Sequence, residues 1–272
     1  MELAQRQATR RRPTQLLQQL ERDGFVQPSA LDLRLVHQLD GMALAAAPEY
    51  EAVLLSPVAP LGCCSVLAPT SQDRTLTTSR GSEVVSDPTN LMALLAAQRL
   101  GRQPDKVVRL CTVHQTLRAQ ALPPVAGYSR HFRMFALTEA GPAQSEDGFE
   151  VAALSRAVAV FDRLFDAAAV LGCRFPRRRA LVRTTAARAT LGQRLTERLR
   201  TTLPHVDLEQ AELDQAYYDG VRISFGADST AGEHVPIGDA GAFDWVAKLT
   251  ANHRQRFVAA GFGLQLLPVL FS

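Results

Sequence analysis

The stretch Ala216-Tyr217-Tyr218-Asp219-Gly220-Val221-Arg222-Ile223-Ser224-Phe225 decides what this chain can fold into. Val221, Ile223 and Phe225 alternate with polar or small residues, which is the period of a strand with one buried face. Residues 226–232 are rich in turn-forming residues and are expected to reverse the chain. The sequence therefore predicts a half-buried strand followed at once by a reversal.

Two further stretches follow the reversal, residues 237–246 and residues 259–267. In the first, Gly238 and Gly241 would let the backbone come close to another group. Apolar residues at helical spacing begin at Phe243 and predict a helix. The second stretch has glycines on both sides of its phenylalanine, as in a strand that passes tightly into a helix.

The order of these stretches resembles the end of the histidyl-tRNA synthetase catalytic core. That family has a strand with a Tyr-Tyr pair, a Gly-Arg-Tyr-Asp segment that opens a helix, and a Gly-Phe-Ala segment before its third motif. The matching segments here are Tyr217-Tyr218, Gly241-Ala242-Phe243-Asp244 and Gly261-Phe262-Gly263.

The resemblance spans about residues 14–271 and implies the α+β fold of class II aminoacyl-tRNA synthetases, a mostly antiparallel sheet flanked by helices. We expect one such domain over residues 14–272, without an anticodon-binding domain. Residues 1–13 are polar and are expected to form a flexible N-terminus.

The segment 14–28 resembles the first class II motif. Thr14 is expected to cap a helix that runs through Arg22, and residues 25–28 are expected to form a short strand that ends in Pro28. In that superfamily the first motif forms the dimer interface, so the resemblance implies a homodimer. The alternative is an ordinary helix, turn and strand.

A candidate for binding an amino group lies at the start of a predicted helix. Pro88 suits a first helical turn, and Ser86 or Asp87 before it suits a cap. The segment resembles the Arg-Pro-Glu-Gly-Thr segment of the histidyl family, where the acid and the threonine hold the substrate's amino group. Asp87 and Thr89 take those two places, although Asp87 could also be no more than a cap.

Arg118 lies between two predicted strands, an arrangement that resembles the second class II motif. The arginine of that motif binds an α-phosphate, and a guanidinium can meet a phosphate or a carboxylate with two hydrogen bonds. The alternative for Arg118 is a surface ion pair.

Together these residues predict one ligand-binding cleft that holds a small zwitterion, with histidine as the first candidate. An acid and a hydroxyl suit an ammonium group, and an arginine suits a carboxylate. Tyrosines offer apolar walls with polar tips. The predicted cleft is formed by Asp87, Thr89, Arg118, Tyr217 and Tyr218.

Four positions depart from the synthetase pattern. Leu213 and Pro268 stand where that family has its catalytic and third-motif arginines, and Met134 and Thr138 replace a glutamine and a glutamate around the substrate. Arg222 could substitute only from a different direction. No catalytic residue is therefore assigned.

An eroded synthetase core of this kind resembles the regulatory subunit of ATP phosphoribosyltransferase, the first enzyme of histidine biosynthesis. That resemblance implies a non-catalytic protein whose partner is the short form of the catalytic subunit. Two alternatives remain open, an enzyme that still activates an amino or other carboxylic acid with ATP, and an RNA-binding accessory factor. The second would use the nine arginines at positions 174, 177, 178, 179, 183, 188, 194, 198 and 200. A solvated basic face is the simpler interpretation of that segment.

Composition narrows these choices. Of 272 residues, 46% are hydrophobic and 21% are charged, which suits a folded domain with a sizeable core. A net charge of +3 is too small to indicate a nucleic-acid partner by itself. Four cysteines without a Cys-x-x-Cys pair suggest reduced, buried thiols and a cytoplasmic protein.

Several other classes of function find no support in the sequence. It has no apolar run long enough for a transmembrane helix and no secretory signal. The six histidines show no metal-ligand spacing. Gly-x-Ser-x-Gly, His-Glu-x-x-His and P-loop motifs are absent, so no metal and no cofactor are predicted.

Overall fold

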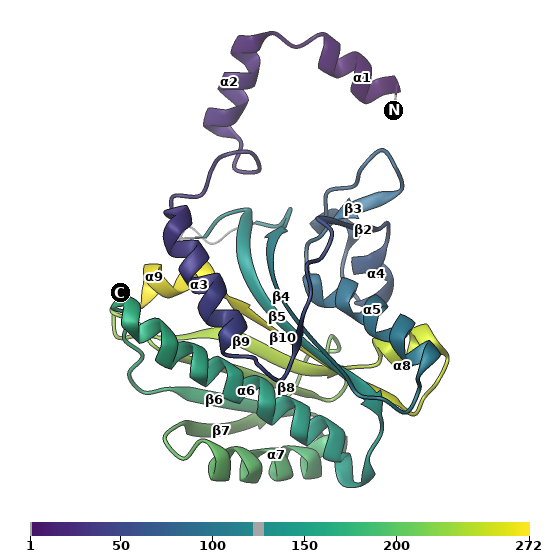
Figure 1. Ribbon diagram of the computed structural model, residues 1–272, viewed down its shortest axis with the longest axis vertical. Coiled ribbons are helices and arrows are strands. Elements are labelled where there is room, and N and C mark those ends of the chain that lie inside the picture. Colours follow the sequence, from purple (N-terminus) through teal and green to yellow (C-terminus); the bar gives the residue numbers. More distant parts are fainter. Residues whose placement is uncertain (1, 122–127) are drawn as a thin grey trace.

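A computed structural model describes residues 2–121 and 128–272 and is organised around one large mixed sheet (Figure 1). The pairs β1–β4 and β6–β7 are parallel, and the five pairs between them are antiparallel. The expected α+β fold with a mostly antiparallel sheet is therefore confirmed. Across the sheet the strands are β1 (Glu51–Ala52), β4 (Val108–Leu117), β5 (His131–Pro142), β10 (Gln255–Gly263), β9 (His234–Phe243), β8 (Val221–Asp228), β6 (Arg179–Thr184) and β7 (Asp207–Glu212).

The strand predicted from the opening stretch is β8, and it pairs antiparallel with β9 after the expected reversal. Val221, Ile223 and Phe225 are at most 1% exposed, because they share the face that lies under the covering helices. The register shifts after Phe225, where Gly226 lies so close to β9 that a Cβ would stand 2.0 Å from the carbonyl oxygen of Val235. Only glycine fits at that crossing.

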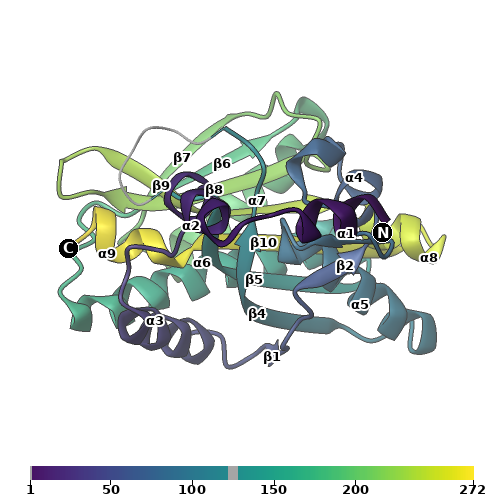
Figure 2. The same ribbon diagram turned by 90° about the horizontal axis from the view of Figure 1, so that it is seen from above.

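Two hydrophobic clusters lie on opposite faces of the sheet. Helices α3, α6 and α7 cover one face, with α3 and α6 side by side in both views (Figures 1 and 2). Helices α4, α5 and α8 contribute to the cluster on the other face. The bounds of these helices are α3 (Leu33–Ala45), α6 (Gly148–Ala168), α7 (Ala189–Thr202), α4 (Cys63–Leu67), α5 (Pro88–Arg102) and α8 (Trp245–Thr250).

Helix α6 is the central helix of the first cluster. Its apolar residues recur at helical spacing from Leu154 to Phe165, a pattern that predicts a helix with one buried face. Phe161 and Phe165 are at most 1% exposed, and their rings pack against Phe225 at centroid distances of 6.4 and 5.1 Å. A Cβ on Gly238 would come within 2.7 Å of the Phe161 ring, so this glycine permits the close packing of α6 on β9.

The predicted strand at residues 25–28 is wrong. The chain turns there, because the amides of Val26 and Gln27 bond to the carbonyl of Asp23. In the described part of the chain, no strand pairs with these residues through its backbone. The order of helix, strand and proline occurs instead at α3, β1 and Pro57. Strand β1 pairs with β4 at the edge of the sheet.

The N-terminal segment forms two helices, α1 (Glu2–Thr9) and α2 (Pro13–Arg22), which stand away from the sheet (Figure 1). Helix α2 begins two residues earlier than a helix capped by Thr14 would, with Arg12 as its N-cap and Pro13 in the first turn. Helix α1 lies within the predicted flexible N-terminus. Its flexibility stays a prediction.

The apolar, proline-containing segment 50–67 suggests strand and loop by its sequence, and it also contains the short helix α4. The threonine-rich segment 75–78 suggests a strand, but this is wrong, because only an isolated bridge between Thr77 and Glu83 forms there. The prolines after residue 120 suggest a loop, which falls mainly outside the described residues. Helix α4 and residues 75–78 lie in the connection between two short strands, β2 (Val58–Pro60) and β3 (Ser82–Val84), which pair antiparallel.

The edge strand β7 is formed almost wholly of exposed residues, and three of them are acidic, Asp207, Glu209 and Glu212. Within residues 2–121 and 128–272, no helix is both long enough and apolar enough to cross a membrane. The same described residues contain no cluster of three side chains that could hold a metal ion.

The four cysteines are buried and free. Burial, with a contribution from the Glu83 carboxylate, raises the pKa of the Cys63 thiol to about 12, and burial raises that of Cys111 to about 11. A raised pKa means less thiolate at pH 8, and the thiolate is the nucleophile. We expect iodoacetamide at pH 8 to leave both residues unmodified in the native protein, as read by mass spectrometry. Labelling in urea is the control, and labelling of Cys63 before unfolding would contradict the prediction.

Candidate functional site

A cavity of about 490 Å³ opens between the start of α5, the β4–β5 hairpin and the C-terminal halves of β9 and β10. All five residues predicted for the ligand site line it, although 130 residues of sequence separate the first from the last. They are Asp87, Thr89, Arg118, Tyr217 and Tyr218. The predicted convergence is therefore observed, and binding itself stays a prediction.

Asp87 has two roles, one for each carboxylate oxygen. It is the N-cap of α5, since its Oδ1 accepts bonds from the Thr89 amide at 3.0 Å and the Thr89 hydroxyl at 2.7 Å. Its Oδ2 faces the Arg118 Nη2 at 3.6 Å. Asp87 is thus a helix cap that still presents an oxygen to the cavity.

Arg118 is held at the cavity wall by groups that leave part of its fork free. Its Nε donates to the Ser86 carbonyl at 2.8 Å, and its guanidinium lies over the Phe132 ring at 5.2 Å. The contact with Asp87 is longer than a hydrogen bond, so the pair is loosely made. Such a pair can open to take a carboxylate on the arginine and an ammonium on the aspartate.

Tyr217 and Tyr218 are both largely buried at the cavity. Burial is the main reason that the pKa of Tyr217 is raised, the Asp87 carboxylate adds to it, and the Arg118 and Arg74 guanidiniums oppose it. Both arginines and Asp87 line the same cavity as this phenol. Tyr218 donates a hydrogen bond from its hydroxyl to Asp239, and burial followed by that carboxylate raises its pKa.

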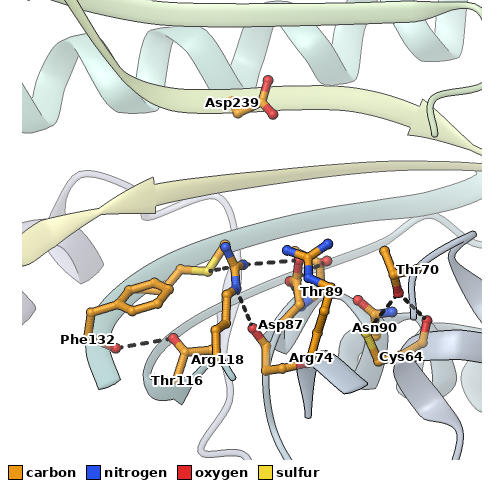
Figure 3. A network of polar contacts seen from close by, with 12 residues as sticks. Cys64, Thr70, Arg74, Asp87, Thr89, Asn90, Thr116, Arg118, Phe132 and Asp239 are labelled. Carbon is orange, nitrogen blue, oxygen red and sulfur yellow. Dashed lines mark hydrogen bonds and ion pairs between the residues drawn. The ribbon is translucent and has the colours of Figure 1, made fainter. Parts of the chain in front are cut away.

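Sequence reasoning missed two charged residues of this cavity. Arg74 comes from the short 3-10 helix before β3, and its Nη2 donates to Gln120 Oε1 at 2.8 Å. Asp239 comes from β9 and accepts from Arg222 Nε at 2.8 Å. In Figure 3 the guanidinium groups of Arg74 and Arg118 lie on one side of the opening, and Asp239 lies on the other.

No local pattern could have revealed Arg74, because Ser71-Gln72-Asp73-Arg74 is typical of an ordinary turn. Asp239 lies in the segment 237–246, between Gly238 and Gly241, and those glycines are the more conspicuous signal in the sequence. Its alternation with Gly241 along β9 places both on the cavity face, which is the signal that could have found it.

One polar atom of the cavity wall lacks a partner. Asn90 is 2% exposed, and its Oδ1 is buried without a hydrogen-bond partner among the described residues. Its amide nitrogen makes only a long contact of 3.4 Å with the Cys63 carbonyl. A buried acceptor left open in this way marks a wall that a ligand donor could complete.

The floor of the cavity is partly filled by side chains lying on glycines. A Cβ on Gly261 would stand 2.2 Å from Met134 Cε, and one on Gly241 would stand 2.3 Å from Tyr218 Cδ1. Met134 therefore covers β10, and Tyr218 covers β9. The departure at Met134 removes a polar group and also occupies space.

Thr138 is buried, with no partner for its hydroxyl among the described residues. The neighbouring acid, Glu139, cannot take over, because successive residues of β5 point to opposite faces. Glu139 lies on the α6 side, where it accepts bonds from Tyr50 at 2.7 Å and from Arg156 Nε at 2.7 Å.

The two other departures, Leu213 and Pro268, are not among the residues that line the cavity. Leu213 is 5% exposed, and Pro268 lies in the terminal helix α9 (Leu267–Leu270). Arg222 reaches the region from β8, but it is ion-paired with Asp239 and lies over the Tyr218 ring at 5.2 Å.

The arginine-rich segment 174–200 is largely paired with acids. Arg178 contacts Asp162 and Asp166 at 2.6 Å, and Arg188 contacts Asp147 at 3.0 Å. Further acidic contacts involve Arg177, Arg179, Arg194 and Arg200. A phosphate backbone would have to compete with these carboxylates, which disfavours the RNA-binding alternative.

Comparison with solved structures identifies the architecture. An ATP phosphoribosyltransferase regulatory subunit/histidyl-tRNA synthetase from Bacillus halodurans C superposes with a TM-score of 0.67 at 12% identity, covering 89% of this chain and 81% of that one. An apo histidyl-tRNA synthetase from S. aureus gives a TM-score of 0.67 at 8% identity, covering 91% and 68%.

A histidine–tRNA ligase subunit from Alicyclobacillus acidocaldarius covers 90% of this chain and 95% of its own, with a TM-score of 0.61 at 13% identity. No protein-family model and no curated protein sequence matches the chain. At these identities the comparisons show the fold alone. The structural neighbours are histidyl-tRNA synthetase-like core proteins, and the chain has the class II aminoacyl-tRNA synthetase fold.

Proposed function

We propose that this protein is a non-catalytic paralogue of the histidyl-tRNA synthetase core that acts as a regulatory subunit of ATP phosphoribosyltransferase. The observation that carries the proposal is the composition of the cavity. It contains Asp87, Thr89 and Arg118, which suit a zwitterion. Leu213 and Pro268, which are not among the residues that line the cavity, take the places that the resemblance assigns to the arginines of adenylate chemistry. The fold shared with a protein described as such a regulatory subunit supports the same role.

A regulatory role needs a connection between the cavity and a surface that a partner can touch. Phe25 lies against the Arg130 guanidinium at 4.7 Å, and Arg130 Nη1 donates to the Gln120 carbonyl at 2.7 Å. The Gln120 side chain in turn accepts from Arg74 inside the cavity. The turn after α2 is thus joined to the cavity wall by three successive contacts.

The direct test uses the purified short-form catalytic subunit of ATP phosphoribosyltransferase from the same host. We expect the two proteins to co-elute in gel filtration and the phosphoribosyltransferase activity to change when this protein is added. An Arg118→Ala variant should keep the complex and lose any response to an added amino acid. No co-elution at micromolar concentrations, with activity unchanged, would remove the proposed partner. The cytoplasmic location and the place in histidine biosynthesis depend on this partner.

We further propose that residues 14–28 lie in a homodimer interface. The apolar stripe of α2 supports this, since Leu16, Leu17 and Leu20 are 54, 58 and 45% exposed. An amphipathic helix with its apolar side in water is expected to seek a second surface. A second copy of the chain is the proposed occupant, because α2 stands away from the sheet with this stripe exposed.

The double change Leu17→Asp and Leu20→Asp is expected to convert the dimer into a monomer, because it places two charges in an apolar contact. Sedimentation velocity at micromolar concentration measures the change. Gln18→Asp, on the same helix but away from the stripe, is the matched control and should remain dimeric. A wild-type protein that sediments as a monomer would rule out the interface.

One observation favours a second function, an ATP-dependent enzyme that activates an amino acid. A second cationic side chain, Arg74, lines the same cavity as Arg118. Two guanidinium groups could hold a phosphate chain where one could not. Pyrophosphate exchange separates this function from the regulatory one.

A further inference from the structure

The cavity contains one positive charge, on Arg74, that is not balanced by an acid in the described part of the chain. Arg118 faces Asp87, and Asp239 is held by Arg222. Arg74, by contrast, has no carboxylate within ion-pair distance in the described part of the chain, and its side-chain bond goes to a neutral amide. Two charge pairs and one unmatched guanidinium therefore surround the opening.

This guanidinium is held in place by its surroundings. Arg74 ends a 3-10 helix whose Gln72 donates to the carboxylate of Glu83 at 2.6 Å. Glu83 is 2% exposed and also accepts from the Gly62 and Cys64 amides at 2.8 and 2.9 Å. The Arg74 carbonyl accepts from the Ala119 amide at 2.9 Å. Both ends of the residue are thus tied to the walls of the cavity.

A cation that is fixed, half-buried and directed into a cavity favours a ligand with a matching anion. Asp87 and Thr89 suit the ammonium of a zwitterion, and Arg118 suits its carboxylate. Those contacts leave Arg74 for a second anionic group, on the same side of the opening as Arg118 (Figure 3). A neutral side chain would leave the Arg74 charge unmatched.

We propose that the ligand of this cavity is an acidic amino acid, with Arg74 as the residue that selects its side-chain carboxylate. The inference rests on the zwitterion site of the proposed function and names its ligand class. A cavity of about 490 Å³ is large enough for such a ligand. Aspartate and glutamate differ in side-chain length. The ratio of their affinities therefore reports which length fits the distance between Arg118 and Arg74.

Calorimetry with matched acid and amide ligands tests the inference. Glutamate is titrated against glutamine, and aspartate against asparagine, because each pair differs by one charge at nearly constant shape. The better acid should bind the wild-type protein at least about tenfold more tightly than its amide, the effect of one charge-assisted contact. Arg74→Gln should reduce that ratio to about one while leaving amide binding unchanged. Arg80→Gln, an exposed arginine on the same hairpin, is the control and should keep the ratio.

The outcomes separate the two proposals. If acids and amides bind the wild-type protein equally, the acidic ligand class is wrong and the zwitterion site stands. If no amino acid binds the wild-type protein, the Asp87→Asn variant or the Arg118→Ala variant, the zwitterion site and this inference are both wrong. The wild-type ratio needs no variant, so a poorly folded Arg74→Gln protein would not rescue the inference.

Discussion

The purified protein is expected to show no amino-acid-dependent exchange of pyrophosphate into ATP. Adenylate formation depends on cationic groups placed around the ATP phosphates, and the resemblance to the synthetase family assigns two such arginines to the positions of Leu213 and Pro268. Each lost contact of this kind typically costs about 10²–10³ in rate, so two losses should leave no measurable turnover. Arg222 does not restore the lost charge, because it is committed to Asp239.

The assay should contain each standard amino acid in turn, with a functional histidyl-tRNA synthetase as the positive control. Arg118→Ala and Arg74→Gln serve as matched variants of the two cavity arginines. Exchange above background that both variants abolish would make the protein an amino-acid-activating enzyme and would reverse the order of the two functions.

Replacing Asp87 by asparagine is expected to weaken amino-acid binding by about 10- to 100-fold with little change in fold stability. The amide oxygen of asparagine can still accept from the Thr89 amide, so α5 keeps its cap. What the variant loses is the negative charge that would face a ligand ammonium, and a hydrogen bond to a charged group is worth about 1.5–3 kcal/mol.

The comparison variant is Asp87→Ala, which removes both the charge and the cap. It should lose binding to a similar degree and also lose about 0.5–2 kcal/mol of stability. Calorimetry with histidine and glutamate measures the first effect, and chemical unfolding measures the second. Full binding by Asp87→Asn would mean that Asp87 serves only as the cap of α5.

Long periodic segments of this fold were predictable from the sequence. Helix α6 and strand β8 carry strong helical and strand periods, and each buries the face that its pattern predicts. The start of α5 was predictable for a different reason, since a proline after an acid is local cap chemistry. Such signals need only neighbours along the chain.

The failures have a common physical cause. Residues 25–28 look like a strand, but a strand forms only where another strand supplies backbone hydrogen bonds. In the described chain the start of β5 meets this segment through the His131 ring, which contacts the Gln27 carbonyl at 2.7 Å, and not through a backbone ladder. Arg74 lies in the connection between β2 and β3, and Glu83 of β3 anchors that connection beside the cavity by accepting from Gln72. Long-range pairing and anchoring decide both, and neither leaves a mark within a few residues.

The acidic edge strand β7 also limits how copies of this protein can associate. An open edge offers unpaired amides and carbonyls to any second edge, and like charges along it repel an incoming copy. An antiparallel pair of β7 strands would bring together Asp207, Glu209 and Glu212 of both copies, six carboxylates along one seam. The sheet is thereby kept from growing from molecule to molecule at this end, and crowded or concentrated protein is guarded against fibre formation through it.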